Sequence, residues 1–323
     1  MTLLRYISRL LPDRFVMLLL GALAFAWFVR APSPLIGILR NVTFAAIFVL
    51  FFLHGLRMAK EDVAKALRNW KVQAAIFVMV FVALPVAGFL LVSALGPPLV
   101  PQLITGLFFL TILPSTVQSA ISFTSLARGN IAASVVAATL INLVAVIVTP
   151  LLLALYTLAE GAEFQWSLVR NIALILLLPF VLGLLAQPML RGWAARQSKL
   201  LSGFDRLVIL LAVYVGFAAS VASGALEVVD RQTLIWIFGI CAILLGFAFA
   251  GSWGLGRILA LEMADRISLL FAGAHKSIAT GAAMAAILFP AETGLFMLPL
   301  IIYHIGQMII SAPLANKLAA RDT

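Results

Sequence analysis

The dipeptide His275-Lys276 lies within a long apolar stretch and is the most informative pair of residues in the sequence. A lysine at the centre of a bilayer costs at least about 2.5 to 3.5 kcal/mol, so it should face a water-filled or protein-lined cavity. The lysine stem spans only about one helical turn, so Lys276 cannot reach either end of its stretch. We therefore expect His275, Lys276 and Ser277 to line an internal site. A purely structural lysine is the alternative.

A second polar segment, Leu113-Pro114-Ser115-Thr116-Val117-Gln118-Ser119, interrupts another apolar stretch. Proline in a helix interior removes a backbone donor and clashes with the preceding turn. One interpretation is an ordinary kink, with Ser115 and Ser119 forming a small-residue packing seam. The other is an unwound segment, whose following half-helix presents free N–H groups and a partial positive charge. This second interpretation makes candidates of Pro114, Ser115, Thr116, Gln118 and Ser119.

The remaining polar residues of apolar stretches are fewer. Asn142 could line the same cavity, while His304 is either a hydrogen-bonded core imidazole or a site residue. We expect His54 to lie at the membrane interface and Cys241 to be a small core residue. All twelve acidic residues lie in expected loops or at expected span ends, so the interior lacks the carboxylates of a cation site or a membrane hydrolase.

These candidates require a membrane to position them. Of the 323 residues, 64% are hydrophobic and 11% are charged, and mean hydropathy is +1.15. A water-soluble core could not bury so much apolar surface, which excludes soluble enzymes and nucleic-acid binders. One cysteine excludes an intramolecular disulfide and a multi-thiolate metal site. The composition predicts an all-α integral membrane protein without a cofactor.

Charge clusters and Gly/Pro pairs divide the chain into ten expected transmembrane helices. Their ranges are 15–29, 41–57, 72–94, 103–126, 131–157, 170–190, 205–225, 232–256, 267–289 and 294–316. The six tryptophans all fall within a few residues of a span end, as expected for a side chain that prefers the membrane interface.

The basic residues predict the orientation of these spans. Seventeen of the 22 Lys and Arg residues fall on the side of the N-terminus, one is Lys276, and the other four are Arg30, Arg40, Arg170 and Arg231. The positive-inside rule places both termini in the cytoplasm, with the bacterial inner membrane as the expected location. Removal of the first span after Ala-Phe-Ala at 24–26 would invert this asymmetry, so we expect the span to be retained.

Comparison of the chain with itself at an offset of 163 residues suggests an internal repeat. It places Val148-Thr149-Pro150-Leu151 on Ser311-Ala312-Pro313-Leu314, and Pro114-Ser115-Thr116 on Ser277-Ile278-Ala279. Each half, 1–160 and 161–323, contains five expected spans, so the second half crosses the membrane in the opposite sense. Inverted repeats with broken helices at matching positions are typical of secondary transporters.

The chain resembles the bile acid:sodium symporter superfamily over essentially its whole length. The resemblance lies in Leu126-Ala127-Arg128-Gly129-Asn130, in the segment 113–119 and in Ala274-His275-Lys276-Ser277. Leu113-Pro114-Ser115 and His275-Lys276-Ser277 are most similar to the orphan branch that contains the seventh human member of solute carrier family 10. The resemblance implies a panel of spans 1, 2, 6 and 7 and a core of spans 3, 4, 5, 8, 9 and 10, in which broken spans 4 and 9 cross.

The resemblance also bears on the coupling ion. Ser119 and Ser134 match hydroxyl positions of the first sodium site of the family, whereas the neighbouring asparagine and threonine positions are occupied by Ala120 and Ala138. The family's glutamate in span nine has no counterpart, and Lys276 lies where the ion-binding side chains cluster. Sodium or a proton is therefore the possible coupling ion, with sodium in doubt.

The sequence thus predicts a transporter and not an enzyme. Two half-helix N-termini and one ammonium group, without a carboxylate, indicate a site for a small organic anion moved by alternating access. The expected partners are this anion and membrane lipid, without nucleic acid. The alternative is a membrane sensor or regulatory protein on the same scaffold, which would bind its ligand without solute flux.

Overall fold

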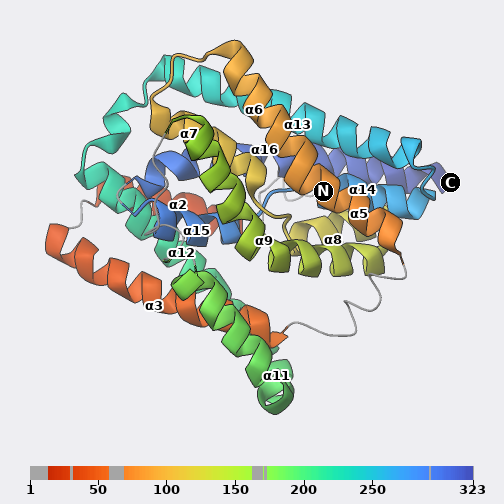
Figure 1. Ribbon diagram of the computed structural model, residues 1–323, viewed down its shortest axis with the longest axis horizontal. Helices are drawn as coiled ribbons and strands as arrows, with labels where there is room; N and C mark the ends of the chain where they lie inside the picture. The colour runs from red at the N-terminus through yellow and green to blue at the C-terminus, as the bar shows by residue number, and fades with distance from the viewer. Residues whose placement is uncertain are drawn as a thin grey trace, which may run out of the picture.

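The structure, a computed structural model, describes residues 14–29, 32–57, 69–161, 170, 173–290 and 292–322. Every regular element in those ranges is a helix, which confirms the predicted all-helical class (Figure 1). Seven of the described helices are long and apolar enough to cross a membrane. They are Pro34–Arg57, Trp70–Leu95, Ile131–Ala159, Leu174–Arg196, Ser198–Ala222, Arg231–Ile258 and Thr293–Ala319.

Most expected spans agree with the observed helices to within a few residues. Helix α2 (Arg14–Phe28) matches the first span, and α9 (Ile131–Ala159) matches the fifth. Helix α13 (Arg231–Ile258) and helix α16 (Thr293–Ala319) match the eighth and tenth. The third span is a composite of α5 (Trp70–Val78), the π-helix η1 (Met79–Ala83) and α6 (Leu84–Leu95).

Three expected boundaries were wrong. Helix α3 (Ser33–Arg57) begins eight residues before 41, α12 (Ser198–Ala222) begins seven before 205, and α11 (Leu178–Arg196) continues six past 190. Polar residues misplaced these boundaries, because a long helix can carry charge near its ends with the head group in water. Asp205, for example, lies inside α12 and forms a salt bridge of 2.8 Å with Arg57. Several expected loop residues lie outside the described ranges: Arg5, Arg9, Arg30, Lys60, Lys65, Arg68 and Trp166.

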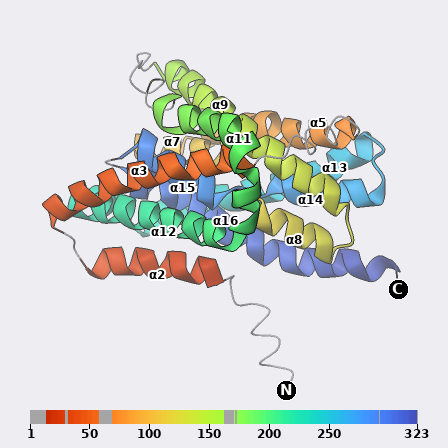
Figure 2. The same ribbon diagram turned by 90° about the horizontal axis from the view of Figure 1, so that it is seen from below.

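Helices α3 and α11 cross at very close range on one side of the molecule (Figures 1 and 2). A Cβ atom at Gly55 would lie 2.1 Å from the carbonyl oxygen of Phe180, and one at Gly183 would lie 2.0 Å from that of Phe52. Only residues without a side chain allow this approach, as in small-residue contacts between membrane helices. Helix α12 packs against both α2 and α3, and it also contacts α16.

The two π-helices of the structure precede the same dipeptide, Leu-Pro. Each has five residues, η1 at Met79–Ala83 and η2 at Ala173–Leu177, and each is followed by Leu-Pro, at 84–85 and 178–179. Proline cannot donate to the preceding turn and its ring crowds the carbonyl four residues earlier. A local widening of the helix relieves that clash, and it leaves a carbonyl without a backbone partner.

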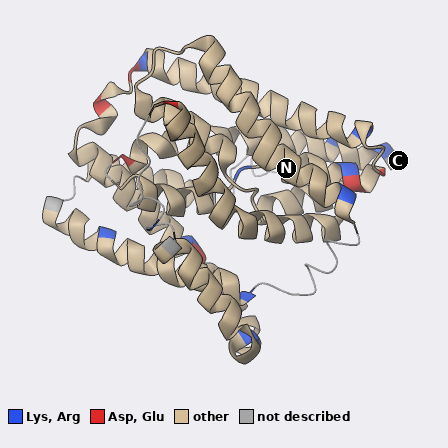
Figure 3. Cartoon of the chain, in the orientation of Figure 1, with Lys and Arg blue, Asp and Glu red and all other residues tan. Residues whose placement is uncertain are grey.

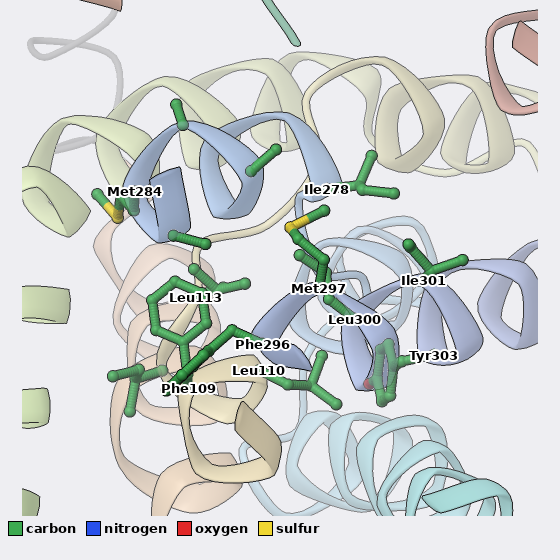
Figure 4. Close-up of a cluster of buried hydrophobic side chains, with 14 of the residues drawn as sticks. Phe109, Leu110, Leu113, Ile278, Met284, Phe296, Met297, Leu300, Ile301 and Tyr303 are labelled. Carbon is green, nitrogen blue, oxygen red and sulfur yellow. The ribbon is translucent and has the colours of Figure 1, made fainter. Parts of the chain in front are cut away.

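Two expected spans are each divided into half-helices. The first pair is α7 (Pro101–Ile112) and α8 (Gln118–Leu126), and the second is α14 (Met263–Ala274) and α15 (Ile278–Leu288). Ser277 is the N-cap of α15, so Ile278 and Ala279, which the offset of 163 residues aligns with Ser115 and Thr116, lie in the helix and not in the break. Apolar side chains surround the breaks (Figure 4), and Gly281 leaves room for Leu113 and Leu300.

The seven long helices do not include these divided spans, because each half-helix is too short to cross a membrane by itself. The ten-span count and the inverted repeat therefore remain predictions.

Candidate functional site

The two breaks meet each other. The backbone N–H of Ser277 donates to the carbonyl oxygen of Pro114 at 2.8 Å, which joins the break of α7/α8 to the break of α14/α15. The backbone enters each break in an extended conformation, with φ and ψ of −71° and 151° at Leu113 and of −78° and 144° at His275. Leu113 precedes a proline, which disfavours the helical region for that residue.

Lys276 is completely enclosed at this crossing, with 1% of its surface exposed. Its Nζ donates hydrogen bonds to the carbonyl oxygens of Thr111 at 2.6 Å, Leu113 at 2.7 Å and Val80 at 3.2 Å. A neutral amine has two N–H bonds and an ammonium group has three. The three acceptors therefore fit the charged form of Lys276.

The three acceptors are available for identifiable reasons. Thr111 and Leu113 lie at the C-terminal end of α7, where the last carbonyls of a helix have no partner in the helix and the helix dipole is negative. Val80 lies in η1, where the N–H of Leu84 reaches back to Met79 and Pro85 has no N–H to offer. The proline after the π-helix thus releases a carbonyl to the lysine.

Side chains of α9 satisfy two further carbonyls at and after the end of α7. The Ile112 oxygen accepts from Thr149 Oγ1 at 2.8 Å, and the Ser115 oxygen accepts from Asn142 Nδ2 at 2.9 Å. With the Leu110 oxygen bonded to the N–H of Leu113, every carbonyl from 110 to 115 has a partner. A break inside a membrane requires this complete pairing, because lipid offers no hydrogen bonds.

Helix α16 pairs the backbone of the second break. Gln307 Oε1 accepts from the N–H of Lys276 at 2.8 Å, and its Nε2 donates to the Lys276 oxygen at 3.2 Å and to His304 Nδ1 at 2.8 Å. The Tyr303 hydroxyl donates to the Ala274 oxygen at 2.8 Å. Tyr303 and Gln307, about one helical turn apart on α16, therefore hold the extended segment that carries the lysine.

His275 connects three helices through its two ring nitrogens. Nδ1 lies 3.0 Å from Ser119 Oγ and 3.3 Å from Thr116 Oγ1, and Nε2 lies 2.8 Å from Ser311 Oγ. Thr116 and Ser119 also share a hydrogen bond. The rings of Phe123, Phe249 and Phe271 stand roughly edge-on around the imidazole, with centroid distances of 5.7 to 6.1 Å. The histidine is buried in this apolar cage and fixes α8 to α16.

A further polar chain leads from the first break to α15. Thr280 Oγ1 donates to Asn142 Oδ1 at 3.0 Å, and Ser277 Oγ accepts the N–H of Thr280 as the N-cap of α15. The hydroxyl of Ser115 is buried here and has no hydrogen-bond partner among the described residues. Gln118, at the start of α8, is exposed.

The structure brings most of the sequence-predicted residues together at the crossing. Ser134 is the exception, because its hydroxyl bonds to Thr124 at 2.9 Å and has no described contact with Ser119. His54 is exposed on α3 and contacts Phe51, not the breaks. The sequence analysis missed several partners: Val80, Thr111, Thr149, Thr280, Tyr303, Gln307 and Ser311. Gln307 carried a signal, as a polar side chain in an apolar span three residues after His304.

Broken helices that meet at buried polar groups define a class, the membrane transport proteins with discontinuous helices. A family model described as the SBF-like CPA transporter family matches residues 13–320, and the chain belongs to this family. The resemblance to the bile acid:sodium symporter superfamily is thus confirmed, and the protein is a membrane transporter.

Similar proteins cover almost the whole chain. It is 36% identical to "Uncharacterized protein PA2026" of Pseudomonas aeruginosa, over 97% of this chain and 95% of that one. It is also 36% identical to "Putative symporter YfeH" of Escherichia coli, over 94% and 92%. Identity to sodium/bile acid cotransporter 7 of Xenopus tropicalis is 26%, over 85% and 81%. The last match agrees with the branch expected from the sequence.

Proposed function

We propose that this transporter moves a small organic anion by alternating access, and that Lys276 occupies the place of a coupling sodium ion. The observation that carries the proposal is the Nζ atom of Lys276, held by three carbonyl oxygens at the meeting point of two breaks. Carbonyls at the ends of half-helices are the ligands that bind sodium in broken-helix transporters. Here a cation that is covalently attached to the protein has that environment. Because this cation cannot cross the membrane, it cannot couple transport to an ion gradient.

The groups around the crossing favour a negatively charged substrate. Helix α8 begins at Gln118, where Val117 and Gln118 are exposed, and its first N–H groups give this end a partial positive charge. The polar partners found at the crossing are hydroxyls, amides, imidazoles and one ammonium group, without a carboxylate among the described contacts. Such a site favours an anion over a cation.

Residues of the two breaks supply the proposed binding site. On the first break these are Pro114, Ser115, Thr116, Gln118 and Ser119, with Asn142 from α9. Ser134 is left out because its hydroxyl bonds to Thr124 and not to a residue of the breaks. On the second break they are His275, Lys276 and Ser277, with His304 from α16. Because the ammonium group already donates three hydrogen bonds, Lys276 acts on the anion through its charge and by fixing the breaks.

The proposed architecture has ten spans in two inverted repeats, 1–160 and 161–323, with both termini in the cytoplasm of a bacterial cell and the protein in the inner membrane. Helix α2 and the pairs α7/α8 and α14/α15 supply the three spans beyond the seven long helices. Two hydrogen bonds support the repeat, because Leu113 and Lys276, like Pro114 and Ser277, are 163 residues apart. Residues at equivalent positions of the two proposed repeats are thus in contact with each other.

The test measures uptake of anions by purified protein in liposomes, in sodium buffer and in choline buffer. The probes are a panel of carboxylate, sulfonate and phosphate anions, beginning with labelled taurocholate. We expect uptake of at least one probe to be equal in both buffers, and Lys276→Met to reduce it at least about tenfold. Lys199→Met, which changes an exposed lysine of α12, should leave uptake unchanged.

Two results would overturn the proposal. Uptake that follows the sodium gradient and persists in Lys276→Met would show that the lysine is structural. Saturable binding of a probe without flux would favour the sensor alternative. Lys276→Met leaves three carbonyls without a donor, so uptake is normalised to folded protein by size-exclusion chromatography. In the unaltered protein, the comparison of sodium and choline needs no substitution.

A further inference from the structure

Three arginines gather around one tryptophan where α13, α14 and α16 come together. The guanidinium carbon of Arg321 lies 5.2 Å from the centroid of the Trp253 ring, that of Arg266 lies 5.4 Å away and that of Arg257 lies 5.9 Å away. Lys317 lies one helical turn before Arg321. Figure 3 shows Lys and Arg concentrated at this end of the molecule, beside the C-terminus.

These cations form no salt bridge among the described side chains, although Glu262 and Asp322 are close to them in sequence. The one salt bridge found among the described residues joins Arg57 to Asp205 and does not involve them. Asp265, which is nearby in sequence, accepts hydrogen bonds from Asn69 and Asn130. A cation–π contact stabilises a single guanidinium group by about 0.5 to 2 kcal/mol, and one indole cannot offset the mutual repulsion of three.

Arg266 is held at this position by the packing of the helices. A Cβ atom at Gly256 would lie 2.7 Å from Arg266 Cγ, so the glycine allows the arginine stem to pack on α13. Its Nη2 donates to the Leu261 oxygen at 3.1 Å, while its Nε is buried without a hydrogen-bond partner among the described residues. A buried donor without a partner beside two further cations indicates that an anion completes the cluster.

A pocket of about 270 Å³ adjoins the arginine cluster and has two chemically different ends. Lys317 and Arg321 line the end toward the helix termini. Trp253 and Leu318 line the same end, and further into the helices the lining is apolar and is formed by Phe249, Ala250, Leu270 and Leu314. The charged end and the apolar end follow the direction of α13 and α16 into the membrane.

We propose that this pocket binds an anionic phospholipid from the cytoplasmic leaflet. The phosphate contacts Lys317 and Arg321, which line the pocket, and the charges of Arg257 and Arg266 beside Trp253 add to the attraction. An acyl chain lies along Phe249 and Leu314. A free phosphate would explain the cations alone, whereas a lipid also covers the apolar end of the pocket. Basic pockets between membrane helices on the cytoplasmic side commonly bind such head groups.

The test compares lipid binding directly and does not depend on transport. Purified full-length protein is placed in nanodiscs of phosphatidylcholine with a small fraction of phosphatidylglycerol brominated on its acyl chains, which quenches nearby tryptophans. We expect stronger quenching than with brominated phosphatidylcholine, and expect Trp253→Phe to remove most of that difference. Raising the salt concentration tenfold should weaken the preference in the unaltered protein, because the attraction is electrostatic.

Substitutions of the arginines provide the second measurement. Native mass spectrometry of retained lipid should show a phosphatidylglycerol preference that falls about fivefold for Arg257→Gln or Arg321→Gln, at about 1 kcal/mol per cation. The triple variant with Arg266→Gln should have no preference. Arg206→Gln, which changes an exposed arginine of α12, is the matched control and should retain it.

The competing outcomes are distinct. Equal quenching by the two brominated lipids, or a preference that persists in the triple variant, would overturn the proposal. Competition by inorganic phosphate or glycerol phosphate at equal concentration would show a small-anion site in place of a lipid site. Loss of preference in Arg206→Gln would show a general effect of surface charge.

Discussion

Gln307 positions Lys276 through the backbone and not through the ammonium group. Its amide pairs with both the N–H and the C=O of Lys276, in the way that a neighbouring strand would pair with an extended segment. The extended conformation directs the lysine side chain toward α7. Gln307 is itself fully buried, so the pair of hydrogen bonds is not exposed to competition from water.

We predict that Gln307→Leu destabilises the protein by at least about 2 kcal/mol, because two buried backbone groups lose their partners. Unfolding in detergent, followed by tryptophan fluorescence, measures the change. Gln232→Leu, at an exposed position of α13, should change stability by less than about 0.5 kcal/mol. Equal effects of the two substitutions would show that the Gln307 bonds contribute little.

Asp230, at the N-terminus of α13, makes a pH-dependent contribution to the stability of the protein. Its Oδ1 accepts the N–H of Thr233 at 2.7 Å, and hydrogen bonds from Thr233 hold the pKa of this carboxyl below its ordinary value of 3.8. A lowered pKa means that the stabilisation is present above the unfolded value and is lost as pH falls through the folded value.

We therefore predict that Asp230→Asn flattens the acid end of the stability profile. Asparagine also caps helices but does not titrate. The difference in Tm between the variant and the unaltered protein, measured from pH 6 to pH 3, should shift in favour of the variant as pH falls. A difference that stays constant with pH would contradict the assignment.

At the scale of elements, the crossing of α3 and α11 depends on two glycines. Gly55→Ala and Gly183→Ala would each place a methyl group about 2 Å from a carbonyl oxygen of the opposite helix. We predict that each destabilises the protein by about 1 to 3 kcal/mol, because rigid backbone must move apart. Thermal unfolding of the purified variants measures this loss.

Each helix offers its own control for this experiment. A Cβ atom at Gly37 of α3 or at Gly192 of α11 would have no neighbour within 4 Å. Gly37→Ala and Gly192→Ala should preserve or slightly raise the stability, since alanine has the higher helix propensity. A similar loss in all four variants would attribute the effect to the helix backbone and not to the crossing.

The elements also show what residue types can and cannot predict. Pro114 and the pair His275-Lys276 marked both breaks, because proline and charge are costly inside an apolar helix. The ligands of Lys276 could not be predicted, because they are carbonyl oxygens that every residue carries. The Val80 carbonyl is one of these ligands because the π-helix before Pro85 leaves it without a backbone partner. The side chain of Val80 gives no sign of this change in the backbone. Arg40 misplaced the start of α3 because charge near a helix end is tolerated.

At the scale of the whole molecule, the proposed topology has a direct test. In a Cys241→Ala background, we predict that cysteines at Pro98 and Glu160 react with an impermeant maleimide in intact cells. Cysteines at Ser125 and Ser198 should react only after the membrane is permeabilised. All four positions are exposed in the structure. Labelling of all four in intact cells would contradict ten spans with a cytoplasmic N-terminus.

The pairing of the two breaks has a consequence for biosynthesis. The carbonyls at the end of α7 receive their donors from Lys276 and Ser277, which are synthesised 163 residues later. At roughly 5 to 20 residues per second, the ribosome needs on the order of 10 to 30 s to reach them. During that interval the first break would have unpaired carbonyls in lipid. We expect residues 101–126 to remain near the translocon, or in a continuous helix, until the second half has been inserted.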